Sequence, residues 1–185
     1  ATGDTIKNDW VFKHLRGKKG TKVEVSVIRG NNKKPIVFKI TRDKIPLNSI
    51  DTWFMIDKEI GYIKLDRFAQ QSNDELVNAL NELKKEGMVD LILDLRSNGG
   101  GYLKTAFEIC DQFLSGNKLI VYTQGLKSAR EELKAEKRGI FETGRLVIMV
   151  DEFSASASEI LSGAVQDWDR GVIVGRRTFG NGLVQ

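Results

Sequence analysis

The sequence contains only one histidine, His14, and only one cysteine, Cys110, among its 185 residues. A single histidine excludes a histidine-rich metal site and leaves His14 as the only candidate for a Ser-His-Asp triad or a Cys-His pair. A single cysteine excludes an internal disulfide framework and any Cys-x-x-Cys zinc or redox motif. We therefore expect any hydrolytic chemistry to use hydroxyl, carboxylate or amine groups, with no metal and no cofactor.

Long apolar runs are also missing, since none approaches the roughly 18 residues of a membrane span. No signal peptide precedes Ala1, which opens directly into a helical pattern, and the chain stops at Gln185 straight after a strand-like pair. We interpret the sequence as a fragment, so the missing signal says nothing about compartment. Net charge is +4, but the basic cluster at residues 16–19 lacks the aromatic neighbours of a stacking platform, and we expect no nucleic-acid partner.

What is present is the composition of an ordinary globular chain, with 41% hydrophobic and 29% charged residues. Residues 1–46 form a first region of short elements. A short helix is expected over residues 10–15, and residues 22–28 alternate apolar and polar side chains as a half-buried strand does. A second strand at residues 35–40 follows turn residues, which predicts a β-hairpin after the helix.

From about residue 60 the pattern becomes alternating strand and helix. Strands are expected at residues 61–65, 89–95, 119–122, 146–150 and 171–175, with helices at residues 72–86, 103–115 and 156–168. Ser72 lies three residues before Glu75, the spacing of a capping box. The charged stretch 125–143 predicts an exposed helix and loop. This alternation predicts an α/β layer with a largely parallel sheet.

Two turns of small residues follow buried strands, which is where open α/β sheets place their sites. Residues 94–101 include three successive glycines, whose backbone N–H groups are unshielded at a helix N-terminus. Such a turn is either an anion or oxyanion cradle or a plain connection between strand and helix. It is not a Walker A loop, because no Gly-Lys-Ser/Thr follows.

The second turn, residues 151–160, carries Ser154, Ser156 and Ser158 at a strand-to-helix junction. A hydroxyl there lies near the positive end of the helix dipole and could be a nucleophile, although serine is also common as a helix cap. A nucleophile needs a base. His14 lies in the other region, where a surface position is the simpler interpretation, and the last lysine, Lys137, precedes all three serines.

Together these stretches resemble the carboxyl-terminal processing peptidases, or tail-specific proteases, which are serine peptidases with a Ser-Lys pair. The matching residues are 93–101, 154–160 and 175–185, in the family's order and spacing. Residues 15–29 resemble the second half of a PDZ domain. The resemblance implies an α/β fold with a ClpP/crotonase-like spiral βα core over residues 47–185, truncated at its C-terminal end, preceded by a partial PDZ-like module over residues 1–46.

The resemblance also assigns roles in the site. It implies that Ser156 is the nucleophile and that the backbone N–H of Ala157 forms an oxyanion hole with that of Gly99 or Gly100. It further implies that Gln185 orients the general base. We expect protein or peptide substrates with exposed C-termini.

The family's base is a lysine at the position that Asn181 occupies in this sequence. A neutral amide cannot take a proton from Ser156, and loss of a general base costs about 10²–10⁴ in rate. We therefore expect this chain to be nearly or wholly inactive. The alternative is a non-catalytic peptide-binding relative of the same fold. A crotonase-like acyl-CoA enzyme would share the glycine turn but would not explain the PDZ-like start or residues 180–185.

The resemblance makes Val11 and Leu15, on the predicted first helix, part of a peptide-binding groove. The carboxylate-binding loop of that groove is not within these residues. The resemblance places the protein in the bacterial periplasm or cell envelope. It implies membrane association only through an N-terminal segment that the sequence does not include, and the oligomeric state is not predicted.

Overall fold

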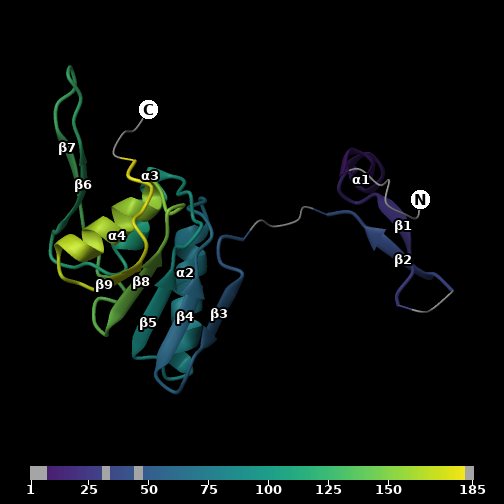
Figure 1. Cartoon of the computed structure of the whole chain (residues 1–185), viewed down its shortest axis with the longest axis horizontal. Coiled ribbons are helices and arrows are strands. Elements are labelled where there is room, and N and C mark those ends of the chain that lie inside the picture. The colour runs from purple at the N-terminus through teal and green to yellow at the C-terminus, as the bar shows by residue number, and fades with distance from the viewer. Residues whose placement is uncertain (1–7, 31–33, 44–47, 182–185) are drawn as a thin grey trace. The chain divides into compact units, whose positions relative to one another are not determined.

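A computed structural model describes residues 8–30, 34–43 and 48–181. The chain divides into two compact units, Ala1–Leu47 and Asn48–Gln185 (Figure 1). Gln185 and the turn expected at residues 31–32 lie outside the described residues.

The first unit contains the predicted helix and hairpin. Its elements are α1 (Asn8–Leu15), β1 (Lys22–Val27) and β2 (Ile36–Thr41), and the two strands pair antiparallel. Arg42 connects the helix to the hairpin, since its Nε donates to the carbonyl of Leu15 at 2.7 Å and its Nη1 donates to Thr21 Oγ1 at 3.1 Å. Many large apolar side chains of this unit stay exposed, among them Trp10, Phe12, Ile28, Val37, Phe38 and Ile40.

The second unit is built on a mixed five-stranded sheet in the order β3-β4-β5-β8-β9. The strands are β3 (Thr52–Met55), β4 (Ile60–Lys64), β5 (Asp90–Asp94), β8 (Leu146–Val150) and β9 (Val172–Gly175). The last four run parallel, as expected, while β3 pairs antiparallel with β4 at one edge. The strand β3 was not predicted from the sequence. The unit is therefore a mixed α/β fold.

The helices α2 (Ser72–Lys85), α3 (Leu103–Cys110) and α4 (Ala157–Asp167) follow β4, β5 and β8 respectively, and α3 packs against both of the others (Figure 1). Ile63, Leu93 and Ile148 occupy one row across three neighbouring strands, and all three are fully buried. The alternate residues Ile92 and Val147 are only half-buried. The core thus lies on one face of the sheet, and the strand order brings the carboxyl ends of β4, β5, β8 and β9 to the same edge.

The predicted capping box at Ser72 and Glu75 is wrong. Ser72 lies inside the helix rather than at its cap, and its Oγ accepts the N–H of Ala69 at 2.7 Å. Glu75 turns instead to the chain that enters the unit and accepts the N–H groups of Ser49 and Ile50 at 2.7 and 2.9 Å. The Glu75 carboxylate, which the capping-box spacing predicted to cap the helix, therefore binds these two backbone N–H groups instead.

The helix expected within residues 125–143 is also wrong, because this stretch contains the strand β7 (Glu131–Lys134). It pairs antiparallel with β6 (Leu119–Thr123), and the two extend away from the helices as a separate ribbon (Figure 1). Glu132 forms ion pairs with Arg130 at 2.8 Å and with Lys134 at 2.9 Å. Residues two apart share one face of a strand, so this charge pattern fits β structure.

Candidate active site

The two turns predicted to carry chemistry meet at the carboxyl ends of β5 and β8, which are neighbours in the sheet. The N–H of Ser97 donates to Asp151 Oδ1 at 2.9 Å, and the N–H of Ala155 donates to the carbonyl of Asn98 at 3.1 Å. These bonds hold the glycine turn against the start of α4. The structure therefore joins two segments that lie more than 50 residues apart in the sequence.

Ser156 is the residue immediately before α4, and its backbone has φ 55° and ψ −113°. An L-residue rarely adopts a positive φ, so the surrounding structure must hold it there. The N–H of Ser156 donates to Glu159 Oε2 at 3.0 Å, and its carbonyl accepts the N–H of Ile160 at 3.0 Å. The half-buried serine thus sits on a sharp turn at the positive end of a helix, an arrangement that serine hydrolases use.

The glycine turn approaches this serine closely. A Cβ at Gly100 would lie 2.8 Å from the Ala157 nitrogen and 2.7 Å from the Ala155 carbonyl oxygen, and the φ of Gly100 is +93°. Only glycine fits that place without strain. Within the described part of the chain, the N–H groups of Gly99 and Ala157 donate to no acceptor, whereas the N–H of Gly100 donates to Asn98 Oδ1 at 2.8 Å.

Glu159 connects the serine to the segment that follows β9. Its Oε1 accepts the hydroxyl of Thr178 at 2.8 Å and the N–H of Gly180 at 2.6 Å. Its Oε2 accepts the N–H of Asn181 and that of Ser156, both at 3.0 Å. Burial raises the pKa of Glu159, but these hydrogen bonds outweigh burial and hold the pKa below its ordinary value. One ionised carboxylate therefore keeps Asn181 beside Ser156.

A second charged cluster lies at the end of β5. Asp94 is fully buried and accepts the hydroxyl of Tyr62 at 2.7 Å, the backbone N–H of Arg96 at 2.9 Å and two N–H groups of the Arg96 guanidinium. Burial and the Asp94 hydrogen bond raise the pKa of Tyr62 to about 12, so this hydroxyl stays protonated near neutral pH. Burial raises the pKa of Asp94 as well, but its bonds to Arg96 and Tyr62 outweigh burial and lower the pKa. This cluster anchors the start of the glycine turn.

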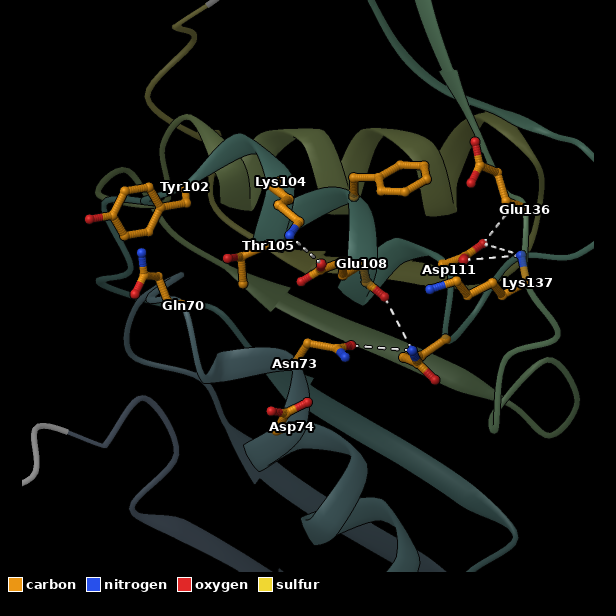
Figure 2. A pocket seen from close by; sticks show the side chains of 12 residues that line it. Gln70, Asn73, Asp74, Tyr102, Lys104, Thr105, Glu108, Asp111, Glu136 and Lys137 are labelled. Carbon is orange, nitrogen blue, oxygen red and sulfur yellow. Dashed lines mark hydrogen bonds and ion pairs between the residues drawn. The ribbon is translucent and has the colours of Figure 1, made fainter.

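A polar pocket of about 770 Å³ begins at Tyr102, the residue that follows the glycine turn (Figure 2). Figure 2 shows Tyr102 and Gln70 at one end and Glu136 and Lys137 at the other. The wall between them comes from α2 and α3, with Lys104 paired to Glu108 at 3.5 Å. None of the predicted site residues lines this pocket, which adjoins the glycine turn without containing Ser156.

The structure describes all but one of the residues predicted to form the catalytic centre and the oxyanion hole. Ser156, Ala157, Gly99, Gly100 and Asn181 all lie at this edge of the sheet. Gln185 lies outside the described residues.

The peptide-binding residues predicted in the first unit lie on α1. Val11 is half-buried there and Leu15 is exposed. His14 is exposed on the same helix, with its ring stacked on Trp10 at 4.0 Å. Across the described ranges no cluster of three or more His, Cys, Asp or Glu side chains could hold a metal ion. No helix in those ranges has the length and hydropathy of a membrane span.

Two residues of the site, Glu159 and Asn98, were not predicted from the sequence. Glu159 lies three residues after Ser156, which is the capping-box spacing, so the motif rule that failed at Ser72 could have found it. Asn98 gave no comparable signal, because a polar residue before glycines is ordinary turn chemistry.

The chain is similar to known proteins in both sequence and structure. Residues 59–185 match the family described as peptidase family S41. A carboxyl-terminal-processing protease of Picosynechococcus sp. is 38% identical over 175 residues, covering 92% of this chain and 41% of that protein. A probable CtpA-like serine protease of Staphylococcus epidermidis is 35% identical over 179 residues, covering 96% of this chain and 35% of that protein.

Among solved structures, the photosystem II D1 C-terminal processing protease superposes with a TM-score of 0.68 at 30% identity, over 91% of this chain and 47% of that one. A putative S41 protease from Bacteroides fragilis shares the fold, with a TM-score of 0.63 at 20% identity, over 86% and 47% of the two chains. The fold is that of a class of serine peptidases. The chain belongs to peptidase family S41, and it spans less than half the length of these relatives.

Proposed function

We propose that this chain is the nucleophile-bearing part of a serine endopeptidase that cleaves near the C-terminus of protein substrates. The observation that carries the proposal is the shared carboxylate of Glu159, whose Oε2 accepts the N–H groups of both Ser156 and Asn181 at 3.0 Å. This contact supports the proposal, because the resemblance implies a nucleophile at position 156 and a lysine base at position 181. The names of the curated relatives support the processing of carboxyl termini.

In this mechanism Ser156 Oγ adds to the scissile carbonyl carbon while its proton passes to a lysine amine at position 181. The carbonyl oxygen becomes an oxyanion that accepts the N–H of Ala157 and that of Gly99 or Gly100. The C–N bond then breaks, the lysine returns the proton to the leaving amine, and water hydrolyses the acyl-enzyme. Gln185 would orient the lysine, as the family resemblance implies.

Asn181 prevents the first proton transfer of this mechanism. An amide nitrogen is not basic, so the proton of Ser156 has no acceptor at position 181. The bond of Asn181 to Glu159 uses the backbone N–H and does not depend on a lysine side chain. We infer that the chain keeps the architecture of the site while its peptidase activity is nearly or wholly lost.

The proposal extends to the whole protein by resemblance. A ClpP/crotonase-like spiral core would carry the nucleophile, and the first unit would be part of a PDZ domain in which Val11 and Leu15 contact the substrate peptide. The substrates would be proteins or peptides with exposed C-termini in the bacterial periplasm or cell envelope.

The test is hydrolysis of a fluorogenic peptide with an apolar carboxyl end, before and after Asn181→Lys. We expect the substitution to raise the rate at least about 10²-fold, and Ser156→Ala in the same chain to abolish the gain. Asn78→Lys, at an exposed position on α2, adds the same charge away from the site and should leave the rate unchanged. A chain that is already as active with Asn181 would contradict the Ser-Lys mechanism.

Asn181 itself favours a second candidate, a peptide-binding relative that does not catalyse. Fluorescence polarisation with the same peptide measures binding separately from turnover. Binding that persists while Asn181→Lys produces no hydrolysis would select this alternative.

A further inference from the structure

Asn98 lies at the point where three strand ends meet, and its side chain is 0% exposed. Its Nδ2 donates to the carbonyl of Leu65, just beyond β4, at 2.8 Å. Its Oδ1 accepts the N–H of Gly100, in the turn after β5, at 2.8 Å. The amide thus uses both of its ends to join two of the strand ends.

The backbone of Asn98 reaches the third strand end. Its carbonyl accepts the N–H of Ala155 at 3.1 Å and the hydroxyl of Ser158 at 2.9 Å. These two residues flank Ser156 and Ala157 in the turn after β8. Asn98 therefore bonds to the chain on both sides of the nucleophile and, through Oδ1, to the glycine that packs against it.

We propose that Asn98 is the positioning residue of the oxyanion hole, an inference that rests on the proposed function. Its Oδ1 holds the N–H of Gly100 and so orients the turn that presents the N–H of Gly99. Its carbonyl holds the turn that presents the N–H of Ala157. An oxyanion hole works only when its donors are fixed before charge develops, and a fully buried amide with both ends bonded provides that rigidity.

Asn98→Ser tests the side chain, because one short hydroxyl cannot bridge Leu65 and Gly100. The matched control is Ser158→Ala, which removes a hydrogen bond to the backbone of Asn98 and leaves the amide contacts in place. Thermal unfolding establishes that both variants fold, and Asn98→Ala, which also lacks the acceptor for the Gly100 N–H, replaces Asn98→Ser in both measurements if that variant does not.

The first measurement uses the chain with Asn181 and follows backbone hydrogen exchange by NMR. We expect the Gly100 amide to exchange about fivefold to tenfold faster in Asn98→Ser, while the Leu93 amide in β5 is unchanged. Ser158→Ala should leave the Gly100 amide protected. Unchanged exchange at Gly100 would overturn the inference.

The second measurement uses Asn181→Lys as the reference and follows hydrolysis of the fluorogenic peptide. Adding Asn98→Ser should lower kcat about 10²-fold with KM within about threefold, because the hole acts on the transition state rather than on the bound substrate. An unchanged kcat, or a loss confined to KM, would overturn the inference and leave the proposed function standing. An inactive Asn181→Lys chain would refute the proposed function and the catalytic role together, and Gly100 exchange would then decide whether Asn98 holds the turn.

Discussion

Glu159 accepts the backbone N–H of Ser156 at 3.0 Å, from one turn further along the helix that begins after this serine. The same carboxylate binds three more donors between Thr178 and Asn181. A carboxylate near the start of a helix is favoured by the helix dipole, so this glutamate stabilises α4 while it joins the turn at Ser156 to the chain after β9. Removal of the Glu159 carboxylate should therefore weaken both α4 and the link between the serine turn and the chain after β9.

Glu159→Gln should lower the free energy of unfolding by roughly 2–3 kcal/mol, because an NH₂ group replaces an oxygen that faces N–H donors. In a chain that also carries Asn181→Lys, Glu159→Gln should lower kcat below that of Asn181→Lys alone, because it displaces position 181. Urea unfolding and peptide hydrolysis measure the two effects. Glu82→Gln, an exposed glutamate of α2, is the control and should change stability by less than about 0.5 kcal/mol.

Gly100→Ala should destabilise the unit by roughly 2–4 kcal/mol. The added Cβ would meet the Ala155 oxygen at 2.7 Å and the Ala157 nitrogen at 2.8 Å, in a backbone conformation with φ +93°. Gly99→Ala is the matched control, because a Cβ there meets no atom within 4 Å. Thermal unfolding of both variants distinguishes them, and equal losses of stability would show that the close approach at Gly100 is wrong.

Stability should fall on acidification because Asp94, Asp151 and Glu159 all have a lowered pKa in the folded chain. The folded state binds these protons less tightly than the unfolded state, so the unfolded state gains more protons as the pH falls. The stabilisation is complete above the ordinary carboxyl pKa of about 4 and is lost as the pH falls towards the lower folded values.

Melting temperatures from pH 7 to about pH 3 measure this dependence. Asp94→Asn should lower the melting temperature at pH 7 and make the acid dependence shallower, since it removes one of the lowered carboxyls. Asp51→Asn, at an exposed position just before β3, should leave both unchanged. A melting temperature that rises on acidification would show that folding does not lower the pKa of these carboxyls.

Arg170→Lys should cost about 2–3 kcal/mol although it keeps the charge. The guanidinium of Arg170 donates to the carbonyls of Phe113 at 3.0 Å, Gly144 at 2.9 Å and Phe141 at 2.7 Å. A lysine ammonium cannot spread over three carbonyls, so the partly buried carbonyls of Phe113 and Phe141 would lose a donor. Chemical denaturation compares this variant with Arg130→Lys on the exposed ribbon, for which little change is expected.

The parallel strands and the glycine and serine turns could be predicted because apolar runs and turn residues are local signals. The strand β3 could not, since Thr52–Met55 is short and its Trp53 and Phe54 stay exposed at the sheet edge. The strand β7 was obscured by charges that are typical of a solvated helix. Periodicity reports which side chains face a core, and neither strand has a core of its own.

The candidate site, like the fold, could be predicted only in part from the sequence. Ser156 and the glycines are recognisable by their neighbours in sequence. The contacts of Asn98 with Leu65 and of Glu159 with Gly180 join segments that only the folded sheet brings together. Local sequence patterns contain the donors and acceptors, but the choice of partner is made by tertiary structure.

Cys110, the only cysteine, is fully buried in α3, and burial raises its pKa above the ordinary thiol value. A buried neutral thiol reacts slowly with maleimides, because the thiolate is the reactive form. The chain is therefore already suited to single-site labelling. A cysteine placed at exposed Phe153, beside the serine turn, would carry a fluorophore without competition from the native thiol and without a cysteine-free background.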